Sequence, residues 1–240
     1  MSLSSIQEPA ALVISCFDQL GPSGKIRLIL ASQSPRRREI LDMMGLAGRF
    51  DVMPSPLDET LVQQRLRQQS ETASVDPIEY TRTLAEEKAK ALAETLDSIE
   101  RTTLVLGSDT IVDLEGVILE KPVDERDAKN TLSRLSGRQH YVHTGVALYA
   151  VTKSKYGAGI ECSKVVSFVD AATVTFAELT PADINAYVAT GEPMDKAGSY
   201  GIQGIGGQLV ERVEGDFFTV MGLPMHRVSR ELSKAMQDLL

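Results

Sequence analysis

The sequence predicts a mixed α/β fold, in which strands and helices alternate before a pair of antiparallel strands late in the chain. Short runs of β-branched and aliphatic residues, such as "KIRLILAS", are followed by signals that start a helix. The segments "HYVHTGVALYAV" and "SKVVSFVDAATVTFAEL" alternate apolar and polar residues as adjacent antiparallel strands do. With 240 residues, 42% of them hydrophobic, the chain can bury one large core or two lobes that share a sheet.

The first elements follow from local signals. Residues 25–32 form a strand that stops at Ser-Gln-Ser-Pro, and a helix then begins with Ser34 as its N-cap and Pro35 in its first turn. That helix ends near Gly45. After "RFDVMPSPLDET", a polar stretch rich in Gln and Arg runs to Asp76, and no element is assigned to it. Asp76 then resembles a capping-box residue and starts a helix that runs to about Leu96.

The later elements complete the sheet. "TTLVLGSDTIVDL" predicts a buried strand followed by a break, and "EGVILEKP" predicts a short return strand. Asp124 caps a further helix, Thr180-Pro181 starts one that stops at Gly191, and a last helix covers roughly Met225 to Leu240. Residues 1–24 carry no basic region before their apolar patch, so they read as an N-terminal extension rather than a secretory signal.

Composition excludes several classes of function. The formal net charge is −8, which argues against a long footprint on a nucleic-acid polymer. The chain has no apolar stretch of about 18 residues that would span a membrane. Cys16 and Cys162 lack the spacing of a metal site and fit a reducing cytoplasm, and the three histidines make no zinc pattern. Neither a P-loop, a GxSxG serine hydrolase motif nor a Rossmann fingerprint is present.

The segment "LASQSPRRREIL" raises the possibility of a small anion site. Arg36 and Arg37 stand in the first turn of a predicted helix, where free N–H groups and guanidinium groups can act on the same oxygens. Cations in a first turn oppose the helix dipole, which favours a functional reason for their presence. The alternative is that they are simply solvated.

Three further positions could belong to the same chemistry. Lys88 lies on the apolar stripe of its helix, so it either extends to water or meets an anion. Asp109 directly follows a run of apolar residues and precedes Thr110, where it could bind Mg²⁺ or accept a proton; the alternative is a turn aspartate that bonds its own backbone. Glu59 and Lys121 are weak candidates on their own, and together these acids and cations match the needs of phosphoryl chemistry.

At this point the sequence resembles a known family. From about Ile26 to Pro224 it is similar to the Maf nucleotide pyrophosphatases, which fits an extension over 1–24 and a single domain over 25–240. The resemblance is carried, in order, by "LASQSPRRREIL", "DET", "LAEEKAKA", "GSDTIV", "EKPVDERDA", "LSGRQHYVHTGV", "DKAGSYGIQGIGG" and "GLP". The chain departs from the pattern by its extension and by longer stretches at 63–74 and 152–162.

The resemblance implies an enzyme that cleaves a nucleoside triphosphate between its α and β phosphates with a divalent cation, Mg²⁺ first and Mn²⁺ or Co²⁺ as alternatives. It implies an elongated two-lobed fold with a central cleft, similar to inosine triphosphate pyrophosphatases, often dimeric, in the cytoplasm. Asp109, Lys88 and Lys121 match catalytic positions; Glu59 and Asp109 match metal positions; the substrate positions are Ser34, Arg36, Arg37, Thr110 and Gln203.

The resemblance also bears on the base. The pattern "SYGIQG" is similar to the branch acting on dTTP and UTP, whereas the 7-methyl-GTP branch tends to carry an acid where Gln203 stands. A neutral amide can both donate to the carbonyls and accept from the N–H of thymine or uracil. Two alternatives stay open: a pyrophosphatase of the 7-methyl-GTP type, and a nucleotide-binding regulator of cell division that does not turn its ligand over.

Overall fold

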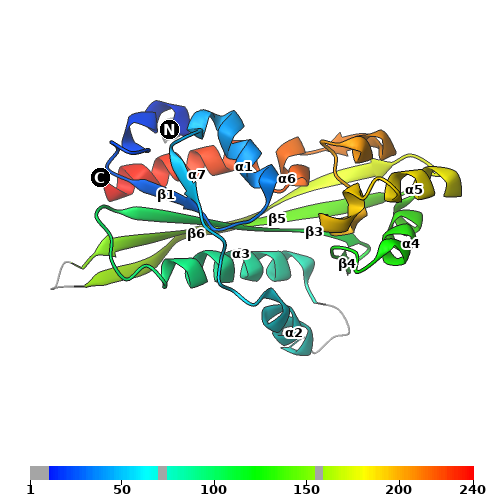
Figure 1. Ribbon diagram of the computed structural model, residues 1–240, viewed down its shortest axis with the longest axis horizontal. Coiled ribbons are helices and arrows are strands. Elements are labelled where there is room, and N and C mark those ends of the chain that lie inside the picture. Colours follow the sequence, from blue (N-terminus) through cyan, green and yellow to red (C-terminus); the bar gives the residue numbers. More distant parts are fainter. Residues whose placement is uncertain (1–10, 70–74, 155–158) are drawn as a thin grey trace, which may run out of the picture.

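The computed structural model describes residues 11–69, 75–154 and 159–240 and is built on a seven-stranded mixed sheet (Figure 1). The strand order is β2-β1-β3-β5-β6-β7, with β4 pairing β3 beside this path. β1 is parallel to β2 and β3, and the other pairs are antiparallel. The strands are β1 (Arg27–Leu30), β2 (Phe50–Val52), β3 (Thr103–Leu114), β4 (Val117–Leu119), β5 (Gln139–Lys153), β6 (Ile160–Phe176) and β7 (Val210–Glu214). The predicted mixed α/β fold is confirmed.

Helices cover both faces of the sheet. In Figure 1, α1 and α7 lie above the strands near the two chain ends, α3 lies below them, and α4 and α5 lie at the opposite end of the molecule. The helices are α1 (Pro35–Leu41), α2 (Glu59–Gln69), α3 (Pro77–Ala93), α4 (Glu125–Leu135), α5 (Pro181–Val188), α6 (Phe217–Met221) and α7 (Met225–Leu239). Shorter turns include η1 (Val13–Gln19), η2 (Asp42–Leu46), η3 (Glu192–Asp195), η4 (Ala197–Ser199) and η5 (Ile205–Leu209).

The core has separate parts because side chains of a strand alternate between its faces. Leu28 and Leu104 face α1 and α7, whereas Ile29 and Val105 face the alanines of α3. A further cluster joins α4 and α5 to the far ends of β3, β5 and β6, with Phe176 at its centre. The long strands β3, β5 and β6 therefore connect two lobes, one next to the chain ends and one containing α4 and α5.

Part of the predicted N-terminal extension belongs to the first lobe. Val13, Cys16 and Leu20 are buried in the same cluster as the residues of β1. The backbone N–H of Val13 donates to Ser229 Oγ of α7 over 3.0 Å. Residues from 13 onward thus contribute to the core of this lobe.

The predicted helix starts are largely confirmed. Asp76 accepts a hydrogen bond from the backbone N–H of Ile78, and Asp124 accepts one from Asp127. Thr180 forms a full capping box with Asp183. Ser34 does precede α1, but its hydroxyl makes no capping hydrogen bond. No helix in the described parts of the chain is long and apolar enough to cross a membrane.

Two helices, α2 and α6, were not predicted. α2 covers residues 59–69, which include the first part of the Gln- and Arg-rich stretch, and it buries Val62 against α3. Its arginines pair with acids of other elements, Arg65 with Glu87 and Arg67 with Glu120. Because these contacts are tertiary, the polar sequence alone gave little sign of a helix. Residues 70–74 and 155–158, in the two longer stretches noted above, lie outside the described residues.

Candidate active site

A cavity lies at a gap along one edge of β3. On this edge β1 pairs with residues 103–106 and β4 pairs with residues 112–114. Between them, within the described chain, residues 107–111 pair only with β5 on the other side. Since no strand closes this edge, side chains from both faces of the sheet reach one cavity.

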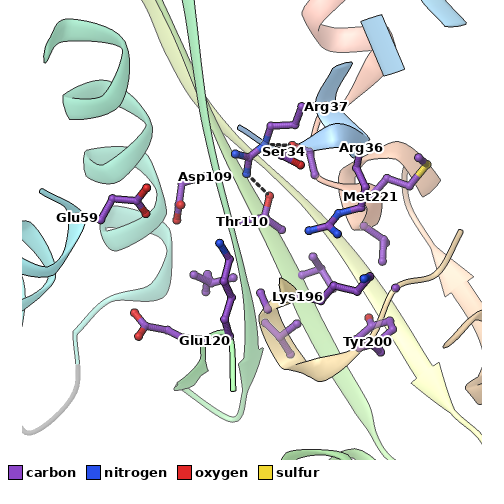
Figure 2. A pocket seen from close by; sticks show the side chains of 18 of the residues that line it. Ser34, Arg36, Arg37, Glu59, Asp109, Thr110, Glu120, Lys196, Tyr200 and Met221 are labelled. Atoms are coloured by element: carbon purple, nitrogen blue, oxygen red, sulfur yellow. Dashed lines mark hydrogen bonds between the residues drawn. The ribbon is translucent and has the colours of Figure 1, made fainter. Parts of the chain in front are cut away.

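All the site residues that the sequence predicted line this cavity, and they come from both halves of the chain (Figure 2). Figure 2 shows Glu59 and Asp109 on the α3 side, with Arg36 and Arg37 across from them. The predicted residues lining it are Ser34, Arg36, Arg37, Glu59, Lys88, Asp109, Thr110, Lys121 and Gln203.

Asp109 does not end a strand, contrary to the sequence interpretation. It lies inside β3, which continues to Leu114 because β5 pairs with it throughout, with Asp109 opposite Gly145. The carboxylate is nevertheless open to the cavity, because β1 has already ended at Leu30. The gap in the edge therefore opens Asp109 to the cavity, as the end of a strand was expected to do.

Lys88 joins the two acids of the site. Its ammonium lies 2.7 Å from Asp109 Oδ1 and 2.8 Å from Glu59 Oε2. The Lys88 side chain is only 8% exposed, so it does not extend to water, and of the two alternatives the anion is the one observed. Those anions are carboxylates of the protein itself. The cluster of two acids and one lysine carries a net charge of −1 when all three are ionised.

Two glycines allow α3 to come close enough for this contact. A Cβ atom at Gly107 would lie 2.5 Å from the carbonyl oxygen of Ala85, and one at Gly145 would lie 2.3 Å from that of Thr81. Any side chain at these positions would push the helix away from the sheet. Lys88, on the buried face of α3, reaches Asp109 because the sheet presents no side chain there.

Arg37 is held by the protein on the opposite face of β3. Its Nε donates to the carbonyl of Gly222 over 2.9 Å, and its terminal nitrogens donate to Ser32 Oγ and Thr110 Oγ1, each over 3.2 Å. Burial lowers the pKa of Arg37 from its ordinary value, and the nearby Asp109 partly opposes that shift. Thr110 is also within 2.9 Å of Thr144 Oγ1. Arg37 thus has a fixed orientation at the cavity wall.

Arg36 already has an anionic partner. Its guanidinium lies 2.9 Å from Asp195 Oδ2, and Lys196 Nζ lies 2.6 Å from Asp195 Oδ1. Burial raises the pKa of Asp195, but these two cations outweigh it and hold the pKa below its ordinary value. An anionic ligand that binds Arg36 must therefore compete with Asp195 or share the cation with it.

The polar residues of the cavity that the sequence interpretation missed include Tyr80, Glu120 and Lys196. Tyr80 donates to the carboxylate of Glu120, which also accepts from Arg67 over 3.1 Å. Burial, followed by the bond to Glu120, raises the pKa of Tyr80. Glu120 directly precedes Lys121, so this contact fixes the backbone that carries Lys121. Only the motif "EKPVDERDA" pointed towards Glu120, and its partners are distant in sequence.

Comparison with known proteins agrees with the resemblance drawn from the motifs. The model of the family described as "Maf-like protein" matches residues 27–235. A dTTP/UTP pyrophosphatase of Bacillus cereus (strain AH820) is 42% identical over 208 residues, which are 87% of this chain and 95% of that protein. The dTTP/UTP pyrophosphatase of Bacillus anthracis is similar to the same extent.

A human relative is longer. The probable bifunctional dTTP/UTP pyrophosphatase/methyltransferase protein of Homo sapiens is 43% identical over 210 residues, 87% of this chain. The chain spans only 32% of that relative's length, whereas it spans nearly all of the bacterial ones.

Proposed function

The chain belongs to the family of Maf-like proteins, and on that premise we propose that it hydrolyses dTTP and UTP to the nucleoside monophosphate and pyrophosphate. The names of the relatives at 42–43% identity support this substrate class. The enzyme acts in the cytoplasm to limit these nucleotides in the free pool, with CTP and modified pyrimidine nucleotides as weaker substrates.

One observation carries the proposal. Lys88 holds Asp109 and Glu59 together on one wall of the cavity that Arg36 and Arg37 line from the other. Carboxylates that can bind a metal or take a proton, opposite cations that can bind phosphate, are the groups that phosphoryl transfer requires. A site that only sensed the nucleotide would not need a buried carboxylate beside the phosphates.

The donor set fits a divalent cation of the magnesium type. Within residues 11–69, 75–154 and 159–240, no group of three or more acids, histidines or cysteines is arranged to hold a metal. Mg²⁺ commonly uses one or two carboxylates, with substrate phosphates and water completing its coordination. Glu59 and Asp109 would supply those carboxylates, with Mn²⁺ or Co²⁺ as substitutes. When bound, the cation would withdraw charge from the phosphates and favour ionisation of the attacking water.

In the mechanism that we propose, Asp109 is the general base. Lys88 contacts Oδ1, so Oδ2 is the oxygen that takes a proton from the attacking water. The water oxygen forms a bond to the α-phosphorus as the bond from that phosphorus to the α–β bridging oxygen breaks. The bridging oxygen leaves with its electron pair as part of pyrophosphate, and the new oxygen stays on the monophosphate.

The cations stabilise the leaving group. Arg36, Arg37 and Lys121 lie on the cavity wall, and Gly222 and Thr110 hold Arg37 in place. In this mechanism the three cations stabilise the negative charge that builds up on the phosphate chain. Ser34 provides a hydroxyl at the start of α1. Losing one such donor typically costs ~100-fold or more in rate.

Gln203 reads the base. Its side chain lines the same cavity as the catalytic residues, in the glycine-rich segment after η4. An amide can donate to a carbonyl of uracil or thymine and accept from the ring N–H, while ATP and GTP present other patterns. This supports dTTP and UTP over the purine nucleotides.

The test is a panel of nucleoside triphosphates incubated with purified protein and saturating Mg²⁺, with pyrophosphate as the product measured. We expect dTTP and UTP to be the best substrates, CTP to be weaker, and ATP and GTP to be poor. A preference for 7-methyl-GTP would favour the other branch of the family. Binding of nucleotide without any release of pyrophosphate would favour the regulatory alternative.

A further inference from the structure

Glu192 has no role in the mechanism above, yet its carboxylate is surrounded by donors. Oε1 accepts from Tyr187 Oη over 2.9 Å and from the backbone N–H of Gly206 over 3.0 Å. Oε2 accepts from the backbone N–H of Ile205 over 2.9 Å. Burial raises the pKa of Glu192, but these hydrogen bonds, together with Lys196, outweigh it, so the pKa lies below its ordinary value. Glu192 is therefore an ionised acid bound by a loop of its own chain.

The loop that Glu192 binds is the one that carries Gln203. Tyr187 Oη, which donates to Glu192, also accepts from the backbone N–H of Gly201 over 3.1 Å. Gln203 lies in sequence between these hydrogen-bonded amides. The amide of Gly201 precedes it, and those of Ile205 and Gly206 follow it. Gln203 itself is exposed and lines the cavity. The buried side chains of Lys196 and Tyr200 line it too (Figure 2). The backbone under Gln203 thus depends on Glu192 at one end and on Tyr187 at the other.

The glycines of this loop are required by the same contact. A Cβ atom at Gly204 would lie 2.5 Å from Glu192 Oε2, and one at Gly206 would lie 2.4 Å from Tyr187 Oη. The backbone can approach the carboxylate and the phenol only where it has no side chain. The close approach of the Glu192 carboxylate and the Tyr187 hydroxyl therefore explains why glycine stands at these positions, whether or not a nucleotide also approaches this backbone.

We propose that Glu192 is a positioning residue for base recognition: by binding the amides of Ile205 and Gly206, it sets the place of the Gln203 side chain and hence the preference for pyrimidine bases. The inference rests on the proposed function, because it assumes that Gln203 reads the base. Glu192 touches neither the acids around Lys88 nor the arginines of α1 in the structure, so it acts on selectivity and affinity rather than on the chemical step.

The test combines Glu192→Gln with Gln203→Ala in a double-mutant cycle on UTP and CTP. A glutamine keeps the size of the side chain but has a single acceptor oxygen, so it cannot accept at both Oε positions. We expect Glu192→Gln to lower kcat/KM for UTP about tenfold, which corresponds to the loss of one hydrogen bond. The loss should come from a higher KM, with kcat staying within about twofold of the wild-type value. The preference for UTP over CTP should fall, and in the Gln203→Ala background the second substitution should have little further effect.

Hydrogen exchange at the amides of Ile205 and Gly206 tests their hydrogen bonds to Glu192 independently of enzyme activity. Exchange at these amides should be faster in Glu192→Gln and unchanged in Glu211→Gln, which alters an exposed acid of β7 in the same lobe. If Glu192→Gln does not fold, Tyr187→Phe removes both the hydrogen bond to Glu192 and the one from Gly201, and it should shift selectivity in the same direction. Additive effects in the cycle, a loss of kcat with selectivity intact, or unchanged exchange would overturn the inference. A wild-type protein that releases no pyrophosphate from UTP would instead overturn the proposed function on which it rests.

Discussion

At the scale of single residues, Lys88 determines how charge is arranged in the cavity. With 8% of its side chain exposed, it bonds Asp109 and Glu59 at 2.7 and 2.8 Å. Two carboxylates held this close would repel each other without a cation between them. In the proposed mechanism these two acids bind a metal and accept a proton, and the arginines of α1 bind the phosphates.

The assignment of Asp109 as general base leads to a direct prediction. Asp109→Asn is nearly isosteric and should keep the fold and most of the nucleotide affinity, but it should lower kcat by ~10²- to 10⁴-fold because the proton acceptor is lost. Asp113→Asn is a matched control, since Asp113 is also a buried aspartate of β3 but does not line the cavity. Steady-state kinetics and melting temperatures would check both. More than about a tenth of wild-type kcat in Asp109→Asn would contradict the assignment.

Gln203 gives a prediction on substrate choice. A carboxylate only accepts hydrogen bonds, so it repels the carbonyls of uracil and suits the N–H groups or the positive charge of a 7-methylated guanine. Gln203→Glu should therefore lower kcat/KM for UTP at least about tenfold. Activity on 7-methyl-GTP, measured in parallel, should rise relative to UTP. Equal activity of the variant and the wild type on UTP would remove Gln203 from base recognition.

The residues of the cavity differ in how far the sequence could predict them. Arg36, Lys88 and Asp109 were identifiable because each is an unusual residue for its local structure or part of a motif. Lys196 and Glu120 also lie in quoted motifs but were not singled out, because their importance comes from contacts with Asp195, Tyr80 and Arg67. Such contacts are made only once segments far apart in sequence are packed together.

At the scale of elements, the closeness of α3 to the sheet decides whether the site can form. Gly107 and Gly145 lie under this helix, and a methyl group on either would collide with a backbone carbonyl rather than with a flexible side chain. The backbone of a packed helix cannot yield without moving its other contacts. The position of α3 thus links core packing directly to the distance between Lys88 and Asp109.

Gly145→Ala tests this link. The added methyl would lie 2.3 Å from the carbonyl oxygen of Thr81, so α3 must shift, and we expect a loss of stability of about 1–3 kcal/mol together with reduced kcat. Gly159→Ala is the matched control, because no atom of the described residues lies within 4 Å of the methyl that it adds. Urea denaturation and UTP hydrolysis would be measured on both variants. Wild-type values in Gly145→Ala would show that the helix is not held by this contact.

The elements themselves were predictable where the signal is local. Asp76, Asp124 and Thr180 each mark a helix start that the structure contains. α2 was missed because its polar sequence becomes a helix only through contacts with α3 and Glu120. The extent of β3 past Asp109 was likewise hidden, since it depends on pairing with β5 rather than on the apolar run.

At the scale of the whole molecule, β3, β5 and β6 run through both lobes and place the cavity where the lobes meet. The second lobe also holds a titrating group. His140 is buried beside Phe176 and bonds Tyr200, a residue of the cavity wall, over 2.9 Å. The homodimer expected from the family resemblance stays a prediction, which light scattering on the purified protein would test.

His140 predicts how stability depends on pH. Burial lowers the pKa of His140 from 6.5 to about 4, so between these values the unfolded chain binds a proton that the folded protein does not. The contribution of neutral His140 to the free energy of unfolding is therefore fully present above pH 6.5 and is lost as the pH falls towards 4. Between pH 6.5 and 4 the free energy of unfolding, measured in urea, should fall by roughly 3 kcal/mol less in His140→Gln than in the wild type. His226→Gln, on the exposed side of α7, is the control. Equal pH profiles of wild type and His140→Gln would contradict the prediction.

Attack of water on the α-phosphorus, assisted by Asp109, is the central claim, and hydrolysis of UTP in water enriched in ¹⁸O tests it most directly. The same products, UMP and pyrophosphate, form whether water attacks the α- or the β-phosphorus, but the label distinguishes the two. Mass spectrometry of the products should find one ¹⁸O atom in UMP and none in pyrophosphate. Label in pyrophosphate, or release of UDP and phosphate, would contradict the mechanism.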